Sequence, residues 1–219
     1  MFVRSRLLML LAAVALWALS PLAAHALSLA DLATEGASFS SLDGQLTFGG
    51  FDVSDLAASG FDPQFIDVVP IELGFQLVPA DDWLRVFDGR IEDPLFHFDV
   101  ESTLGIQGVR LGIGNAFEGP LARGPGSAVR VEVSGDSLAA LLVAELAAGQ
   151  EGSAADRAAS AGGSTLTLWT RVDLLSGDPD GSALFPRIEY RFETEVPEPG
   201  TTSLLLLGLA GAGWIRRRL

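Results

Sequence analysis

The sequence predicts an all-β protein, an antiparallel β-sandwich with a jelly-roll-like arrangement. Several segments alternate apolar and polar residues with a period of two, the pattern of a strand with one face on a core and one face in solvent. Clusters of Gly, Pro and Asp separate these segments and mark turns, as in "VPADD" and "FEGPLARGPG". Only one segment of the domain has helical spacing, and strands of this kind joined by turns are typical of a sandwich.

The first 26 residues have the order of a secretory signal peptide. A cationic start, "MFVRSR", precedes an apolar run from Leu7 to Leu19, and the "AHA" of Ala24 to Ala26 provides a small-x-small cleavage site. We expect a signal helix here and cleavage after Ala26, which leaves residues 27–196 as an extracellular β-sandwich domain.

The expected strands of that domain differ in how clearly they alternate. In "LTLWTRVDL" (166–174) the even-numbered residues would face the core, while Trp169 and Arg171 would face solvent. In "LFHFDVE" (95–101), Phe96 and Phe98 would face the core and His97 would face solvent. Further strands are expected at 128–133, 187–196, 45–53, 65–69 and 71–78.

One segment has the spacing of a helix instead. In "DSLAALLVAELAAG" (136–149), Leu138, Leu141, Leu142 and Leu146 recur at intervals of three or four and a glycine follows, so we expect one short helix near 137–148. The next segment, "QEGSAADRAASAGG" (150–163), has few bulky residues, and we expect a mobile loop there.

The charge of the chain excludes some partners. The net charge is −14, and residues 27–196 hold 27 acidic residues against 9 arginines, a net charge of −18. Such a surface repels nucleic acid and anionic membranes, so cations or neutral sugars are better partners, unless the charge serves solubility alone. Because the chain has no cysteine, thiolate metal sites and a cysteine nucleophile are excluded.

Gly135-Asp136-Ser137-Leu138 follows an expected strand and is similar to the nucleophile segment of GDSL esterases. That family implies a D-x-x-H motif near the end of the chain, which would supply the base for the serine, and no such motif follows here. The only histidine of the expected mature domain is His97. We therefore expect no catalytic residues and no enzyme activity, and we interpret Asp136 or Ser137 as a helix cap.

Two features leave a binding function open. In "SGDPDGS", Asp178 and Asp180 could begin a calcium site, although a solvated type I turn is the commoner outcome and no Glu follows at EF-hand spacing. Of the aromatic residues Trp83, Phe96, Phe98 and Trp169, only Trp169 is expected on a polar face, where it could contact a sugar or be covered by a loop. We expect no bound cofactor and no metal.

The chain ends in "VPEPGTTSLLLLGLAGAGWIRRRL". From Thr201 to Ile215 no residue is charged, and as a helix this run would cover roughly 22 Å of a hydrocarbon core of about 30 Å. Basic residues that flank an apolar span stay in the cytoplasm, so we expect Arg216, Arg217 and Arg218 inside and the domain outside.

This tail resembles the PEP-CTERM sorting signal through Pro197, Glu198, Pro199, the apolar run and the terminal arginines. The resemblance implies that residues 197–219 are recognised by an exosortase, that the membrane segment is removed, and that the domain is released or covalently transferred. It also implies a bacterium with an envelope that usually makes exopolysaccharide. A simple membrane anchor is the alternative. The start of the domain, with Leu46, Thr47, Phe48 and Phe51, resembles an uncharacterised ectodomain group that implies no activity.

Together these features predict an exported, exosortase-processed protein of the cell envelope or extracellular matrix. We expect a non-catalytic structural or interaction role, with exosortase, the inner membrane during export and exopolysaccharide as partners, and no nucleic acid. The alternatives are a carbohydrate- or calcium-binding module and, remotely, a GDSL-like serine esterase.

Overall fold

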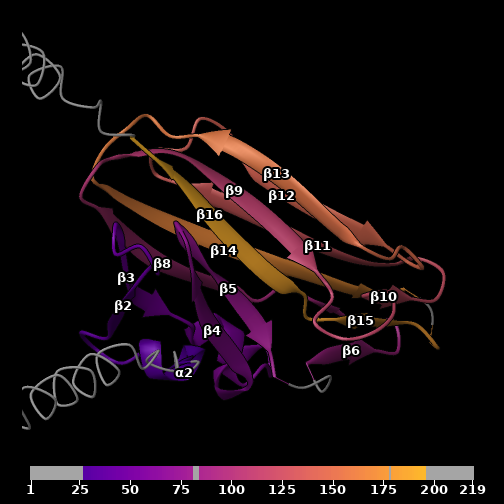
Figure 1. Cartoon of the computed structure of the whole chain (residues 1–219). Helices are drawn as coiled ribbons and strands as arrows, with labels where there is room; N and C mark the ends of the chain where they lie inside the picture. Colours follow the sequence, from indigo (N-terminus) through magenta and orange to yellow (C-terminus); the bar gives the residue numbers. More distant parts are fainter. Residues whose placement is uncertain (1–26, 81–83, 178, 196–219) are drawn as a thin grey trace, which may run out of the picture.

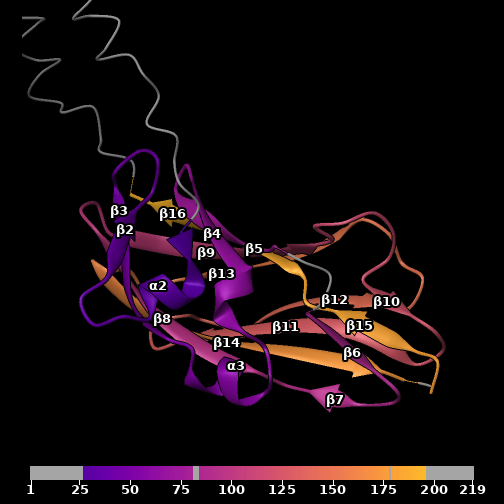
Figure 2. The same cartoon turned by 90° about the horizontal axis from the view of Figure 1, so that it is seen from below.

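A computed structural model describes residues 27–80, 84–177 and 179–195, which form two antiparallel sheets and a small third sheet (Figure 1). Figure 2 shows the two large sheets as separate layers, with β8, β11 and β14 in one and β5, β9 and β16 in the other. The predicted β-sandwich is therefore confirmed. The expected signal helix and apolar tail helix lie outside the described residues, and within those residues no helix is long and apolar enough to cross a membrane.

The first layer is a six-stranded sheet in the order β1-β4-β5-β16-β9-β13. Every neighbouring pair in it is antiparallel. Its strands are β1 (Leu27–Ser28), β4 (Ile66–Ile71), β5 (Gly74–Pro79), β16 (Arg187–Thr194), β9 (Ile106–Gly114) and β13 (Ser153–Ala159).

The second layer is a seven-stranded sheet in the order β12-β11-β14-β8-β3-β2, with β7 also paired to β14. Its strands are β12 (Leu142–Ala147), β11 (Ser127–Gly135), β14 (Thr165–Ser176), β8 (Leu95–Ser102), β3 (Leu46–Asp52), β2 (Ser38–Ser40) and β7 (Ile91–Glu92).

The remaining elements are short. A three-stranded sheet in the order β10-β15-β6 is built from β10 (Ala122–Arg123), β15 (Ser182–Leu184) and β6 (Arg85–Phe87). The helices are α2 (Leu29–Leu32), α3 (Ser54–Ala58) and the 3-10 turn η1 (Pro63–Phe65). Ser28 caps α2, because its hydroxyl accepts a hydrogen bond from the Asp31 N–H at 3.1 Å. In return, the Asp31 carboxylate accepts a hydrogen bond from the Ser28 N–H at 3.3 Å.

The alternating faces of the strands build one core between the layers. On β14 the even-numbered residues are buried from Leu166 to Ser176, as the sequence predicts. The centre of the core is aromatic: Phe75 of β5 lies 4.9 Å from Phe48 and 5.1 Å from Phe98, measured between ring centroids, and both partners belong to the opposite sheet. Edge-on contacts between aromatic rings on the inner faces of the two sheets therefore join the two layers.

A hydrogen bond between two buried side chains also joins the two sheets. The Thr170 hydroxyl on β14 and the Tyr190 hydroxyl on β16 lie 2.7 Å apart, and both side chains are fully buried. Burial raises the pKa of Tyr190, although the hydrogen bond with Thr170 opposes this rise, so the phenol stays neutral and can donate.

Tyr190→Phe should lower the free energy of unfolding by about 1–3 kcal/mol, because it leaves the buried Thr170 hydroxyl without this partner. The double variant Tyr190→Phe/Thr170→Val should recover most of that loss, since both polar groups are then replaced by apolar ones. Denaturant unfolding of the two single variants and the double variant gives the coupling energy. Additive effects of the two changes would contradict a bond between the sheets.

The helix predicted near 137–148 is wrong. Asp136 and Ser137 form a turn, Leu138 forms an isolated antiparallel bridge to Ser160, and Leu142–Ala147 is strand β12. β12 pairs with β11 from Ala128↔Ala147 to Val133↔Leu142. Leu142, Ala144 and Leu146 also fit a period of two, and all three are buried. By pairing with β11, strand β12 satisfies backbone groups of β11 that would otherwise lie at the edge of the sheet, so tertiary contacts override the local preference.

The mobile loop predicted at 150–163 is also wrong, because it contains β13. This strand pairs with β9, a strand that the sequence analysis missed, from Ser153↔Gly114 to Ala159↔Gly108. Of the β13 residues only Ala158 is buried, so the strand is held by its backbone and gives no hydrophobic alternation. In β9 most residues are buried, and there the glycines at 108, 112 and 114 break the apolar alternation in the sequence.

The segment at 71–78, expected as one strand, is a hairpin between β4 and β5. Leu73 turns the chain with a positive φ of 55°. Gly74 is required directly after it, because a Cβ at this position would lie 1.9 Å from the Tyr190 carbonyl oxygen. The turn therefore brings the β5 backbone close enough to pair with β16.

The β12 edge of one sheet and the β13 edge of the other lie side by side (Figure 1). The Asp156 carboxylate of β13 accepts a hydrogen bond from the Val143 N–H of β12 at 2.8 Å. A second link joins the Ala139 N–H to the Ala159 carbonyl at 2.9 Å. This side of the sandwich is thus closed by hydrogen bonds between the sheets.

Candidate functional site

An exposed tryptophan stands at the centre of the outer face of the seven-stranded sheet. Trp169 of β14 is 37 % exposed and lies directly opposite His97 of β8 in the ladder. The two ring centroids are 6.3 Å apart, with planes tilted by 38°. The position of Trp169 on the solvent face is confirmed, and of the two alternatives the structure favours the open one, because no loop among the described residues buries the indole.

Hydroxyl and carboxylate groups lie on one side of this ring pair. Asp52 of β3 is opposite His97, and its Oδ1 accepts from the Ser54 N–H at 3.0 Å. This backbone hydrogen bond, with the Ser54 hydroxyl and nearby His97 adding to it, lowers the pKa of Asp52. Two residues before Trp169 on the same face of β14, the Thr167 hydroxyl donates a hydrogen bond to Oδ1 of Asp99 at 2.6 Å. Two carboxylates are therefore held beside the rings.

A bulge in β3 produces this arrangement. The register with β8 shifts between Gly49, which is opposite Asp99, and Asp52, which is opposite His97. Gly50 has a φ of +62°, and a Cβ there would lie 2.5 Å from Asp99 Oδ2. The glycine thus permits both the turn of the backbone and the close approach of the carboxylate.

The other side of the ring pair carries a cation and a groove. Arg171 binds Asp93 at 2.7 Å and Asp173 at 2.8 Å, and Asp173 followed by Asp93 raises the pKa of the guanidinium. A groove of about 340 Å³ beside it has Ile91 and Leu175 on its walls. Ile91 is 67 % exposed and Leu95, which is opposite Arg171, is also exposed. Apolar side chains thus continue from Trp169 toward β7.

The outer face of the six-stranded sheet is different. Glu193 binds both Arg110, at 2.8 Å, and Arg157, and these hydrogen bonds lower the pKa of its carboxyl. Glu189 accepts from Gln76 and pairs with Arg191. Opposite charges pair on the outer faces of both sheets, but among the described residues no strand of the six-stranded sheet carries an exposed large apolar side chain. The seven-stranded sheet is therefore the better place for a ligand.

The structure does not assemble the esterase site. Gly135 is followed by turns and not by a helix, so neither Asp136 nor Ser137 is a helix cap. Asp136 instead accepts a long hydrogen bond, 3.4 Å, from the Thr167 N–H. The serine that pairs with Trp169 across β11 and β14 is Ser134 and not Ser137, and Trp169 in turn pairs with His97 of β8.

The remaining predicted residues contribute little to a site. Phe96 and Phe98 are buried in the core, as expected. Asp180 is exposed, while Asp178 and Trp83 lie outside the described residues. Within the described ranges no three His, Cys, Asp or Glu residues are grouped to hold a metal ion.

The sequence analysis did not identify Asp52, Asp99 and Leu95 as neighbours of Trp169. It did place Trp169 and His97 on solvent faces. Their contact depends on the pairing of β14 with β8, and no pattern within either strand specifies that pairing.

Residues 195–218 match the PEP-CTERM protein-sorting motif. The sorting signal predicted for the tail is thereby confirmed: the motif directs export across the inner membrane and a location at the cell surface or outside the cell after processing. No curated protein matches the sequence.

Two solved structures overlap part of the chain. One is TmCBM61 in complex with beta-1,4-galactotriose, which is 15 % identical, with a TM-score of 0.31 over 67 % of this chain and 89 % of that chain. The other is the C-terminal domain of a chitobiase from Bacteroides fragilis, which is 11 % identical, with a TM-score of 0.29 over 73 % of this chain and 100 % of that chain.

Proposed function

Because the chain carries a sorting motif for export, we propose that it is a non-catalytic protein of the cell envelope or extracellular matrix that binds neutral polysaccharide. The observation that carries the proposal is the exposed Trp169 ring beside His97, on an open sheet face with hydrogen-bonding groups on either side. The tail supports delivery of this face to the place where such polymers are found.

The chemistry of the face suits a sugar. An indole offers a flat apolar surface for the C–H face of a pyranose ring, and its two side-chain torsions cost little entropy to hold. The carboxylates of Asp52 and Asp99 can accept hydrogen bonds from sugar hydroxyls, and the Arg171 guanidinium can donate to them. An open face also admits the middle of a long polymer, which an enclosed pocket would exclude.

The charge of the domain favours a neutral polymer over an anionic one. Residues 27–196 carry a net charge of −18, and the carboxylates of Asp52, Asp99 and Asp93 lie around the Trp169 face. A polyanion would meet repulsion along its length, whereas a neutral glycan would not.

The proposal includes the processing of both chain ends. Signal peptidase would cut after Ala26, and an exosortase would recognise Pro197-Glu198-Pro199 while Arg216, Arg217 and Arg218 remain in the cytoplasm. The sorting motif at 195–218 supports this order of events, which would end with release of the domain or its covalent transfer.

Trp169→Ala should weaken binding of the mature protein to the exopolysaccharide of its host at least 10-fold, on the order of 1.4 kcal/mol. The loss follows from removal of the stacking surface, and Trp169 is exposed enough that the core should be unaffected. Affinity electrophoresis in gels containing the polysaccharide measures the change.

Phe65→Ala is a matched control, because it removes an aromatic ring that is 49 % exposed at the end of η1. It should bind like the wild type. Equal binding by Trp169→Ala and the wild type would overturn the site, and ester hydrolysis lost in Ser137→Ala would overturn the non-catalytic assignment.

A further inference from the structure

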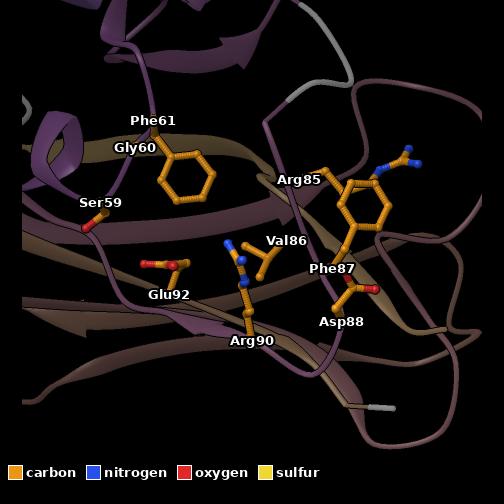
Figure 3. Close-up of a pocket in the computed structure, with 9 residues that line it drawn as sticks. All are labelled: Ser59, Gly60, Phe61, Arg85, Val86, Phe87, Asp88, Arg90 and Glu92. Carbon is orange, nitrogen blue, oxygen red and sulfur yellow. The ribbon is translucent and has the colours of Figure 1, made fainter. Parts of the chain in front are cut away.

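A second cavity lies behind β7, away from the Trp169 face. It has a volume of about 360 Å³ and lies between the loop after α3 and the β6–β7 turn (Figure 3). Ile91 of β7 lines the groove beside Arg171, whereas its neighbours Arg90 and Glu92 line this cavity. The two sites are therefore separated by the backbone of β7.

The cavity has a rigid apolar wall. Phe61 and Val86 are buried, and the Phe61 ring packs 6.0 Å from Phe185. Phe87, by contrast, is 49 % exposed, and the Arg85 guanidinium lies over its ring with Cζ 5.5 Å from the centroid. Ligand pockets commonly combine a fixed apolar wall, here Phe61 and Val86, with an accessible aromatic ring, here Phe87.

Arg90 brings a cation into this cavity. Figure 3 shows its side chain extending between Glu92 and Val86. None of the salt bridges between described residues includes Arg90, although the chain carries a net charge of −14. Because no described carboxylate forms a salt bridge with it, the Arg90 guanidinium keeps its N–H donors available for a ligand.

The backbone that carries Arg90 is held in place. Asp88 and Gly89 form the turn before it with φ angles of 61° and 70°, the positive-φ turn for which an Asp-Gly pair is preferred, and the Arg90 N–H donates to the Phe87 carbonyl across it at 3.3 Å. The Arg90 carbonyl then accepts from both the N–H and the hydroxyl of Ser176, each at 3.1 Å. Hydrogen bonds of the backbone therefore fix the position from which the Arg90 side chain extends.

We propose that this cavity binds a sugar residue that bears one carboxylate, a hexuronate. The Arg90 guanidinium would hold the carboxylate through paired N–H donors, the geometry that arginine offers best. The exposed Phe87 ring would contact the C–H face of the sugar, and the Glu92 carboxylate would accept from a hydroxyl. Because Asp88 and Glu92 also line the cavity, a dianion such as a phosphate or sulfate ester would be repelled.

The test is titration calorimetry of the mature protein with sodium glucuronate and galacturonate, as monosaccharides and short oligomers. Uronates should bind, and the corresponding neutral sugars should bind at least 10-fold more weakly at this site. Arg90→Gln should reduce uronate affinity at least 10-fold. Arg123→Gln is the matched control, because Arg123 also takes part in no salt bridge between described residues, and it should bind uronates like the wild type.

Further arms separate this proposal from its alternatives. Phe87→Ala provides a second variant on an exposed residue in case Arg90→Gln fails to fold, and it should also weaken uronate binding. Trp169→Ala should leave uronate binding unchanged, which makes failure of this site distinct from failure of the polysaccharide site. Three results would each overturn the proposal. The first is that no uronate binds, and the second is that uronate binding survives both Arg90→Gln and Phe87→Ala. The third is that a short peptide binds equally well through its C-terminal carboxylate.

Discussion

Replacing Phe75 by alanine should lower the free energy of unfolding by about 3–5 kcal/mol. Phe75 is fully buried, and its ring lies within 5.5 Å of the rings of Phe39, Phe48, Phe98 and Tyr190, measured between centroids. Three of these partners belong to the opposite sheet, so the substitution would open a cavity where the two layers meet. Neighbouring rings are themselves fully packed and can fill such a cavity only in part.

Denaturant unfolding of the mature protein measures this loss. Phe65→Ala, on the surface, should change the stability by less than about 0.5 kcal/mol, which controls for the loss of a phenylalanine as such. A loss below about 1.5 kcal/mol for Phe75→Ala would mean that the core collapses around the missing ring, or that the sheets do not meet there as described.

Replacing Glu198 by alanine should cause most molecules to keep their C-terminal tail. The change removes the only charge between Pro197 and Pro199, within the matched sorting motif, and it lies beyond β16, which ends at Thr194. The variant should therefore fold normally and be exported, but should accumulate in the membrane fraction. Intact mass spectrometry of protein from the native host reads both chain ends directly.

A suitable control for this experiment is Glu35→Ala, which removes one exposed carboxylate after α2. It should be processed like the wild type. Recovery of Glu198→Ala with the same C-terminus as the wild type would show that the exosortase does not read this residue, and a wild-type protein that keeps Leu219 would show that the tail is a simple anchor.

The sequence predicts those strands that bury one face in the core. β14 and β8 are examples, because every second residue from Leu166 and from Phe96 meets the opposite sheet. It does not predict β13, whose side chains bury little, nor does it distinguish strand from helix at 142–147, where leucines fit both periods. An alternation of apolar and polar residues indicates that one face of a strand is buried. A strand such as β13, which is held mainly by backbone hydrogen bonds, lacks this alternation.

The same limit applies to the candidate site. A solvent-facing Trp169 is predicted from one strand alone, because its neighbours Leu168 and Thr170 belong to the core face. Its surroundings come from β8 and from a bulge in β3, so they depend on which strands pair and in which register. That information is distributed over the whole sheet.

The closed side of the sandwich has a consequence for how many copies can be arranged at a surface. An open strand edge lets one domain add to another in a growing fibre, but here β12 and β13 cover each other and the Asp156 carboxylate already occupies the Val143 N–H. The opposite edges, β1 and β2, are only two and three residues long and offer little template. We therefore expect that strand pairing at these edges does not join copies of this acidic domain, and in the proposed polysaccharide-binding role the polymer would be what links them.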